Sequence, residues 1–342
     1  MAAPKTIIFT SLVVLSCVLP LYEAVLDAHF YDQTCQQAED IILKTVHNAS
    51  INDPKVSAHI LQMFFHDSFI RDASILLDST PGNQAEKDGP NISVRAFYVI
   101  DEANAKIEKE CPHTVSCADI IAIAARDVIA TTGGPHWRVL KGRKDGRVSK
   151  ASETLTYQHL HLTQPNLSKA LPKEDLVALS GSHTLGFPHC SSFEARLHNF
   201  SSVNDFDPSM NIEFAKRFRN KCPKTESGRS AGEFLDLTSS SFDNVYYKQI
   251  VAGKGLLGSD QTPLGDYRTR GLVESFAKDK VLFFREFTAA MFKLGNVGVM
   301  QEGKVRLNCR VINRERERER VPVVKFMSKT LDSSNQRSNI MI

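Results

Sequence analysis

Two of the eleven histidines stand beside residues that suit chemistry. His66 follows an apolar run and directly precedes Asp67, and His183 lies within segment 180–186, which reads Ser-Gly-Ser-His-Thr-Leu-Gly. A histidine in either setting can be a metal ligand or an acid/base group. It can equally be a core residue held by hydrogen bonds, and the pattern alone leaves both interpretations open.

Several kinds of site are disfavoured by what surrounds these histidines. Neither has a His or Cys partner at zinc spacing, which argues against a structural zinc site. The chain has no Gly-x-Ser-x-Gly elbow and no glycine-rich phosphate loop, which weakens hydrolase and nucleotide-binding hypotheses. Two histidines on separate helices can instead flank a flat cofactor such as haem, one as axial ligand and the other as acid/base.

The segments that must position the two histidines are predicted to be helical. Asp53 and Pro54 suit the N-cap and the first turn of the helix that carries the first histidine. Residues 173–180 predict a second helix, and Gly181 is a natural stop for it. The second histidine then follows just beyond the stop.

The remaining pattern also indicates helices. Ser116 and Asp119 form a capping-box pattern that opens an Ile/Ala-rich helix to Asp127. Asp279 is predicted to cap a helix whose apolar residues share one face: Phe283, Phe284, Phe287, Met291 and Leu294. Alternating strands, internal repeats and Gly/Ser linkers are not evident, so the sequence predicts an all-α fold.

The charge of the chain is concentrated at its end. The 342 residues contain 42 Lys and Arg against 39 Asp and Glu, and the surplus lies in residues 314–342. The balanced remainder argues against a nucleic-acid partner. We expect residues 314–342 to be a solvated, charged tail that joins no core.

The N-terminus indicates secretion. Lys5, the apolar stretch 7–21 and small or polar residues around Ala24 predict a signal peptide over residues 1–24, with an N-terminal anchor helix as the alternative. Six cysteines remain after its removal, an even number that predicts three disulfides with fifteen possible connectivities. Asn-X-Ser sequons at Asn48, Asn91, Asn166 and Asn199 suit the same route.

Taken together, the motifs between residues 25 and 313 resemble those of the secretory (class III) plant peroxidases. The resemblance runs in order along the chain and includes all six mature cysteines. It is carried by His29-Phe30-Tyr31 to Cys35, Phe65-His66-Asp67, Asp72-Ala73-Ser74-Ile75-Leu76-Leu77, Val115-Ser116-Cys117-Ala118-Asp119, Gly134-Pro135-His136-Trp137, Asp175 to Thr184, Phe242-Asp243-Asn244, Ser259-Asp260-Gln261 and Asn308-Cys309-Arg310.

This resemblance implies a haem-dependent plant-peroxidase fold over residues 25–313, in which two helical halves sandwich haem b (heme b). His183 matches the proximal iron ligand, and Asp260 matches the carboxylate that accepts its other ring N–H. His66 matches the distal base. Asn91 matches the amide that orients this base, with Glu86 supporting it, so the sequon at Asn91 is expected to be unused.

The resemblance also implies two calcium sites and a disulfide pattern. Oxygen ligands suit calcium. The distal set is Asp67, the Ile70 carbonyl, Asp72 and Ser74, and the proximal set is Thr184, Asp236, Thr238 and Asp243. The implied disulfides are Cys35–Cys111, Cys117–Cys309 and Cys190–Cys222.

Three departures from the family pattern bear on function. Gln62 stands where the family has a distal arginine that stabilises the anionic peroxide, which predicts slower peroxide activation. The family's fourth disulfide is absent, with Ser68 at one cysteine position, and a carbonyl ligand of the distal calcium is lost with it. The connection around residues 162–165 is also shorter than the family expects.

The first functional hypothesis is a secreted, monomeric haem peroxidase. It uses hydrogen peroxide to oxidise small phenolic donors by one-electron steps, in hydrogen peroxide removal and cell-wall phenolic chemistry, with wall or vacuole as its location. The alternative is a catalytically weakened haem- and calcium-binding wall protein, which Gln62 favours. A third possibility is a chain that cannot fold as written.

Overall fold

The computed structural model describes residues 26–70, 73–89, 91–152, 171–297, 299 and 303–313. Within these ranges the regular elements are helices, and extended residues pair only in isolated bridges. The all-α prediction is therefore confirmed. The expected signal peptide, the connection at 162–165 and the charged tail lie outside the described residues. In the described part, no helix is both long and apolar enough to cross a membrane.

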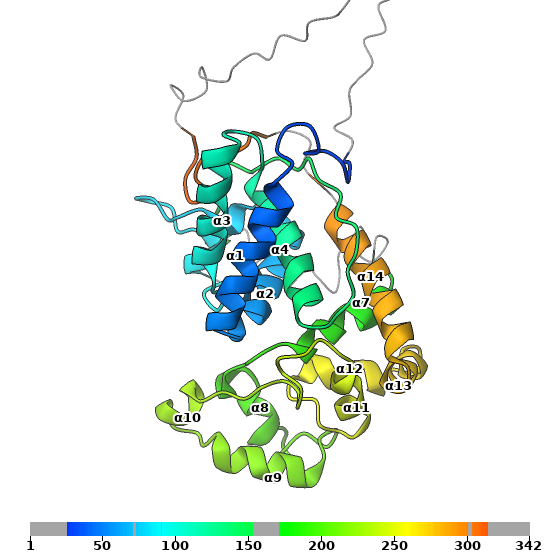
Figure 1. Cartoon of the computed structure of the whole chain (residues 1–342). Coiled ribbons are helices and arrows are strands. Elements are labelled where there is room, and N and C mark those ends of the chain that lie inside the picture. The colour runs from blue at the N-terminus through cyan, green and yellow to red at the C-terminus, as the bar shows by residue number, and fades with distance from the viewer. Residues whose placement is uncertain are drawn as a thin grey trace, which may run out of the picture.

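Four helices build the upper lobe of the molecule (Figure 1). They are α1 (Ala38–Asn52), α2 (Lys55–Ile70), α3 (Phe97–Glu110) and α4 (Cys117–Thr131). The first three pack against α4, and every α4 residue from Cys117 to Ile129 is buried. This helix is apolar nearly all round because it is the centre of the lobe, as its Ile/Ala-rich sequence requires.

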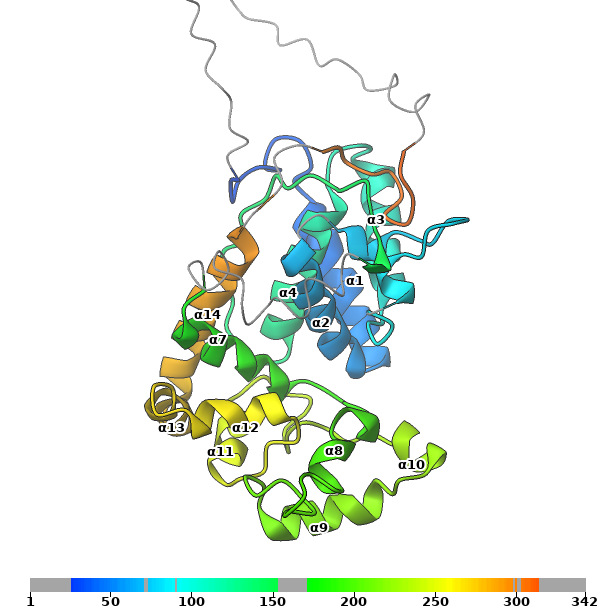
Figure 2. The same cartoon turned by 180° about the vertical axis from the view of Figure 1, so that it is seen from behind.

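A second group of helices flanks and underlies this lobe (Figures 1 and 2). It comprises α7 (Lys173–Ser180), α11 (Val245–Val251), α12 (Gly258–Gly265), α13 (Arg270–Lys278) and α14 (Lys280–Asn296). The predicted apolar face of α14 is buried at Phe283, Phe287, Met291 and Leu294, while Phe284 is half-buried. These side chains join one large core shared with the upper lobe.

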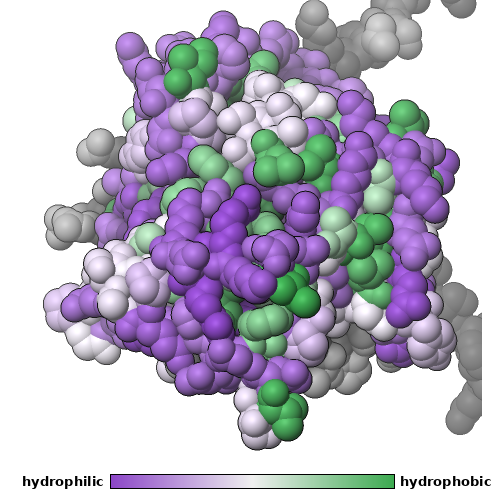
Figure 3. All heavy atoms as spheres, turned by 90° about the horizontal axis from the view of Figure 1, so that it is seen from below, coloured by the Kyte–Doolittle hydropathy of each residue, from purple (hydrophilic) through white to green (hydrophobic). Residues whose placement is uncertain are grey.

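The bottom of the molecule has a small core of its own. It lies among α8 (Glu194–Leu197), α9 (Ile212–Lys221), α10 (Glu226–Ser230) and the loops between them. On α9, Phe214, Ala215 and Phe218 face this core and the charged residues face solvent. Seen from below, the lower face is mostly hydrophilic with a few separate apolar patches (Figure 3).

Short 3₁₀ turns connect these helices near the candidate site. They are η1 (Ser74–Leu76), η2 (Glu86–Asp88), η3 (Gly181–Thr184) and η4 (Cys190–Ser192). The third of them contains His183. The predicted histidine-bearing loop is therefore a further helical turn, and its backbone is correspondingly well defined.

The predicted caps are present where the local sequence specifies them. Oδ1 of Asp53 accepts the backbone N–H of Lys55 at 3.0 Å, and α2 begins at Lys55, one residue after Pro54. Oγ of Ser116 accepts the N–H of Asp119 at 3.1 Å, and α4 continues past Asp127 to Thr131. Caps depend on neighbouring residues only, which is why the sequence predicts them well.

The predicted helix over residues 173–180 is confirmed, because α7 ends at Ser180 with Gly181 as its C-cap. The backbone of Gly181 is right-handed, with φ −61° and ψ −13°, and beyond the α-helix the chain continues as the 3₁₀ turn η3. A Cβ here would lie 2.4 Å from the ring of Phe283 and 2.6 Å from the hydroxyl of Tyr247. The glycine therefore permits close packing of the turn that carries His183 against α11 and α14.

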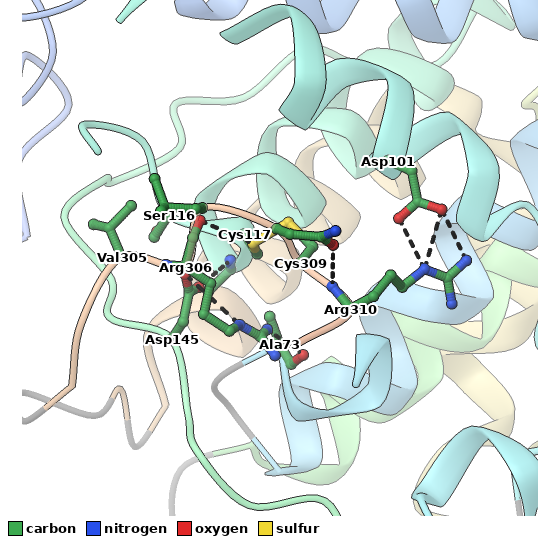
Figure 4. The surroundings of a disulfide bond; sticks show 12 residues. Ala73, Asp101, Ser116, Cys117, Asp145, Val305, Arg306, Cys309 and Arg310 are labelled. Atoms are coloured by element: carbon green, nitrogen blue, oxygen red, sulfur yellow. Dashed lines mark hydrogen bonds and ion pairs between the residues drawn. A yellow bond between two sulfur atoms is a disulfide. The ribbon is translucent and has the colours of Figure 1, made fainter. Parts of the chain in front are cut away.

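The C-terminal segment 303–313 is fastened to the upper lobe at several points (Figure 4). Cys309 forms a disulfide with Cys117 at the start of α4. The guanidinium of Arg310 makes a bidentate ion pair with Asp101 on α3, at 2.8–3.0 Å. The backbone N–H of Arg306 donates to Oδ2 of buried Asp145 at 2.8 Å. These contacts return the end of the described chain to the lobe in which it began.

Candidate active site

His66 projects from α2 toward a buried amide. Its Nδ1 lies 2.7 Å from Oδ1 of Asn91, a side chain with 0% exposure. An amide oxygen only accepts hydrogen bonds, so Nδ1 carries the proton and Nε2 of the neutral ring is the basic nitrogen. Burial lowers the pKa of His66, and the Asn91 bond opposes that shift only in part. The ring is therefore neutral near pH 7 and can accept a proton.

The turn that holds Asn91 is built by η2. The backbone N–H of Asn91 donates to the carbonyl of Glu86 at 3.1 Å, and its own carbonyl accepts from Val94 at 2.9 Å. The carboxylate of Glu86 accepts the hydroxyl of Ser74 at 3.3 Å, and its backbone N–H donates to Ser149 at 3.1 Å. Glu86 thus contacts Asn91 through its backbone carbonyl.

A polar stripe runs along the same side of α2. Lys55, His59, Gln62 and His66 follow one another at intervals of three or four residues, which places them on one helix face. Nε2 of Gln62 donates to Oγ of Ser93 at 3.1 Å. His66 bonds Asn91 and Gln62 bonds Ser93, so the segment that begins at residue 91 runs alongside this face of α2.

The outer end of this stripe is positively charged. Burial lowers the pKa of His59, with the nearby Arg95 and Lys55 acting in the same direction and Asp53 opposing them. Nζ of Lys55 lies 4.9 Å from the ring centre of Phe187, four residues beyond His183. The stripe on α2 therefore borders the segment that carries the second histidine. Neither Lys55 nor Arg95 was predicted as a site residue, and Arg95 lies outside α2, so only the fold brings it near His59.

His183 faces a buried carboxylate. Its Nδ1 lies 2.7 Å from Oδ1 of Asp260, which is 1% exposed. The same oxygen accepts the hydroxyl of Tyr246 at 3.2 Å, and Oδ2 accepts the N–H of Leu257 at 2.8 Å. The carboxylate is held by three donors, so its direction toward the imidazole is fixed.

The carboxylate reverses the electrostatics of this second ring. Burial alone would lower the pKa of His183, but the charge and hydrogen bond of Asp260 outweigh it and raise the pKa. The ring of Tyr246 packs edge-on against the imidazole, with centroids 5.9 Å apart. The His183 side chain nevertheless keeps 36% of its surface exposed. One edge of the ring is therefore fixed by Asp260, and accessible surface remains for a ligand.

The expected proximal calcium residues come together beside His183. Oγ1 of Thr184 donates to Oδ2 of Asp236 at 2.6 Å, and Thr238 bonds both Asp236 at 3.3 Å and Asp243 at 3.1 Å. Burial raises the pKa of Asp236 to about 6, with the charge of Asp243 adding to the shift and the threonine bonds opposing it. Two close carboxylates with two hydroxyls fit a hard cation.

The distal calcium set is only partly described. Asp67 and Ser74 are both buried, and Ile70 is the last residue of α2. Asp72 lies outside the described residues. The described part of the chain therefore does not assemble this site.

Three disulfides join the cysteine pairs that the family resemblance implies. Besides the bond at Cys309, they link the start of the domain to the end of α3 and close a ring within the small core. The pairs are Cys35–Cys111, Cys117–Cys309 and Cys190–Cys222. The large core and the small core thus each contain at least one cross-link.

Comparison with known proteins shows the family to which the chain belongs. The family model described as Peroxidase matches residues 42–279, more than half of the chain. The chain is similar to Peroxidase 66 of Arabidopsis thaliana, at 59% identity over 322 residues that cover 92% of this chain and 100% of the relative. It is 48% identical to Peroxidase 64 of Arabidopsis thaliana over 293 residues, 83% of this chain and 92% of the relative. It is 41% identical to Peroxidase 5 of Vitis vinifera over 317 residues, 89% of this chain and 96% of the relative. The chain therefore belongs to the peroxidase family, in its plant class III (secretory) branch.

Proposed function

We propose that this peroxidase uses His183 as the axial ligand of a haem and His66 as the base that activates hydrogen peroxide. The observation that supports the assignment is the hydrogen bond at Nδ1 of each ring, 2.7 Å long in both cases. Each bond occupies one nitrogen and leaves Nε2 as the reactive one. Small phenolic donors would then be oxidised in one-electron steps.

The residues present fit a haem. Membership of the family implies haem and typically calcium. His183 offers an imidazole backed by a carboxylate, the arrangement that strengthens electron donation to a metal. Lys55 and Arg95 supply positive charge at the outer end of the stripe on α2, where the carboxylates of a porphyrin would be neutralised. A bound haem would supply the iron at which peroxide is reduced.

The protein's own part in peroxide activation is proton transfer. Nε2 of His66 would take a proton from one peroxide oxygen and return it to the other, so that the second oxygen leaves as water when the O–O bond breaks. The two electrons that this cleavage needs would come from the bound haem. Asn91 holds the ring in the required tautomer. Because the pKa of His66 is lowered, the base is unprotonated and ready at neutral pH.

Gln62 weakens this machinery and favours a second candidate function. Its amide is neutral and donates to Ser93, so it supplies no positive charge to an anionic peroxide. Loss of one such electrostatic donor typically slows a reaction by about 10²–10³-fold. The second candidate is accordingly a haem- and calcium-binding wall protein with little peroxidase turnover.

The remaining features extend the proposal. Thr184, Asp236, Thr238 and Asp243 would hold the proximal calcium, next to the iron ligand in sequence. We infer a secreted monomer located in the wall or vacuole. Of the described sequons, Asn48 and Asn199 are exposed, whereas buried Asn91 is engaged with His66. A glycan is therefore expected at one or both exposed sequons and not at Asn91.

The proposal is tested with protein secreted by a eukaryotic host. We expect a haem Soret band and hydrogen peroxide-dependent oxidation of a simple phenol, with the His66→Ala variant as the matched control that keeps the band and loses turnover. A Soret band without turnover in the natural chain supports the second candidate. Soluble, folded protein that takes up no haem contradicts both.

A further inference from the structure

Arg196 is a buried cation that binds the loop leading into α12, the helix that carries the carboxylate behind His183. It is 5% exposed and lies on α8, which stands between α12 and α10 in the lower part of the molecule (Figure 2). Its Nη1 donates to three successive backbone carbonyls, at 2.7, 2.8 and 2.8 Å: those of Gly255, Leu256 and Leu257. Three consecutive carbonyls directed at one nitrogen require the chain to curl around it, so the guanidinium sets the shape of this loop.

The charge of Arg196 is compensated where it lies. Nε donates to Oδ2 of Asp207 at 2.8 Å, and Nη2 donates to the hydroxyl of Ser209 at 3.2 Å. Burial would raise the pKa of Asp207, but the bonds from Ser209 and Arg196 outweigh it and lower the pKa. All three nitrogens of the guanidinium donate to groups of the protein, so the role of Arg196 is to fix the backbone of the loop at residues 255–257.

The held loop ends at the residue that orients Asp260. Leu257 is the N-cap of α12, with φ −81° and ψ 151°. Its N–H donates to Oδ2 of Asp260 at 2.8 Å, and its carbonyl accepts the N–H of Asp260 at 3.1 Å. The Leu257 carbonyl that accepts from Arg196 thus belongs to the residue whose N–H fixes the carboxylate.

A continuous path therefore joins Arg196 to the proximal histidine. It runs from the guanidinium to Leu257, from Leu257 to Oδ2 of Asp260, and from Oδ1 of Asp260 to Nδ1 of His183. Tyr246 holds Oδ1 from the other side at 3.2 Å. Apart from the covalent backbone of Leu257 itself, the steps in the path are hydrogen bonds between buried or half-buried groups, where such bonds are strongest.

We propose that Arg196 is a positioning residue that sets the strength of the Asp260–His183 hydrogen bond, and through it the electron donation of His183. The proposal rests on the proposed function, in which His183 is the iron ligand. Arg196 touches neither the imidazole nor the carboxylate. It acts by binding the Leu256 carbonyl, which belongs to the same peptide as the Leu257 N–H, and so keeps that N–H in the one orientation that directs Asp260 at the ring.

Loss of Arg196 has a defined physical consequence. Three carbonyls lose their shared donor, the loop relaxes, and Asp260 is no longer held in one direction. The imidazole then has less anionic character, which weakens the iron–histidine bond and makes the ferric/ferrous potential more positive. Outer partners of metal ligands typically change metal affinity by about 10–100-fold, and we expect about tenfold faster haem loss here.

The experiment uses the haem-loaded, full-length protein and four variants. Resonance Raman spectra of the ferrous form give the iron–histidine stretching frequency, and transfer of haem to excess apomyoglobin gives the loss rate. Asp260→Asn is the reference for complete loss of the hydrogen bond. Arg196→Ala removes the clamp, and Arg196→Lys keeps a buried charge beside Asp207 but has one nitrogen in place of three.

A matched control comes from the helices around the small core, where Arg196 also lies. Arg229 on α10 pairs with Glu194 on α8 at 2.7 Å in an exposed ion pair, and touches none of the three carbonyls. Arg229→Ala should leave the iron–histidine frequency unchanged. The Arg196→Lys and Arg196→Ala frequencies should both fall, between that of the natural protein and that of Asp260→Asn. If Arg196→Ala does not fold, Arg196→Lys alone decides.

The outcomes separate this inference from the proposed function. A lowered frequency and faster haem loss in the folded Arg196 variants support the inference. A natural frequency in Arg196→Lys, together with a lowered one in Asp260→Asn, overturns it and leaves the proposed function intact. If the natural protein has no iron–histidine band, or Asp260→Asn does not change it, the proposed function fails and this inference falls with it.

Discussion

The two histidines of the candidate site are held in the same way, but by one neutral and one negatively charged acceptor. His66 and His183 each form an Nδ1 hydrogen bond of 2.7 Å. The partner of the first is the neutral amide of Asn91, and its pKa is lowered by burial. The partner of the second is the carboxylate of Asp260, which overcomes burial and raises the pKa. The charge of the acceptor, and not the length of the bond, separates the two roles.

The largest difference between the two histidines is expected in haem binding, when each is replaced by alanine in turn. His183→Ala should abolish stable haem binding, because the protein loses its axial ligand. His66→Ala should keep the haem, since that ring is a base and not a ligand. Absorption spectra and haem content of the two purified variants make the comparison. A histidine-ligated spectrum retained in His183→Ala would refute the assignment.

Removing the base should slow the reaction with peroxide. A positioned acid/base group typically contributes about 10²–10⁴-fold, so His66→Ala should lose about that factor in the second-order rate with hydrogen peroxide. Stopped-flow absorption in the Soret region measures it. Oxidation of phenols by protein already oxidised should change little, because the base acts on peroxide. An unchanged peroxide rate would remove His66 from the mechanism.

A positive charge can also be introduced near His66, at the position of Gln62. Gln62→Arg places a cation one turn from His66, and we expect the peroxide rate to rise by about 10²–10³-fold. Gln62→Leu is the matched control, because it breaks the same 3.1 Å bond to Ser93 without adding charge. Equal rates in both variants would show that the departure at Gln62 is not what limits this enzyme.

The smallest and most specific effect is expected when His66 is given a carboxylate acceptor like the one that His183 has. His66 must be neutral to act, so the peroxide rate should fall as the pH drops through its pKa, which lies below the ordinary value of about 6.5. Asn91→Asp supplies a carboxylate that favours the protonated ring. The acid limit of the rate should then move upward by about 1–3 pH units. A pH profile of the peroxide step checks this, and an unmoved limit would contradict the role of Asn91.

What the sequence predicted well was local. The cap at Ser116 and the aromatic face of α14 depend on residues a few positions apart, and both are present. The end of α7 at Gly181 was predicted in the same way, but the close packing of this glycine against the ring of Phe283, which lies far away in the chain, was not. Propensity and periodicity contain no information about such a contact.

The pairings of the site were expected only through the family resemblance. Asn91 lies 25 residues from His66, and Asp260 lies 77 residues from His183. No spacing rule links residues so far apart, whereas the motifs of a known family do. Lys55 and Arg95 lie outside the family motifs, and only the fold places the segment that begins at residue 91, including Arg95, beside α2.

The disulfide at Cys309 gives the molecule an unusual tolerance to breakage. It spans 192 positions and so encloses α7 to α14, including the entire small core, in one covalent ring. Cys190–Cys222 forms a second ring inside it, around the exposed turn 201–205. A protease that cuts this turn, where nicking is easiest, would leave both fragments tethered. The cut chain should migrate as one species until a reductant is added. The segments that carry His66 and His183 should stay joined in the cut protein.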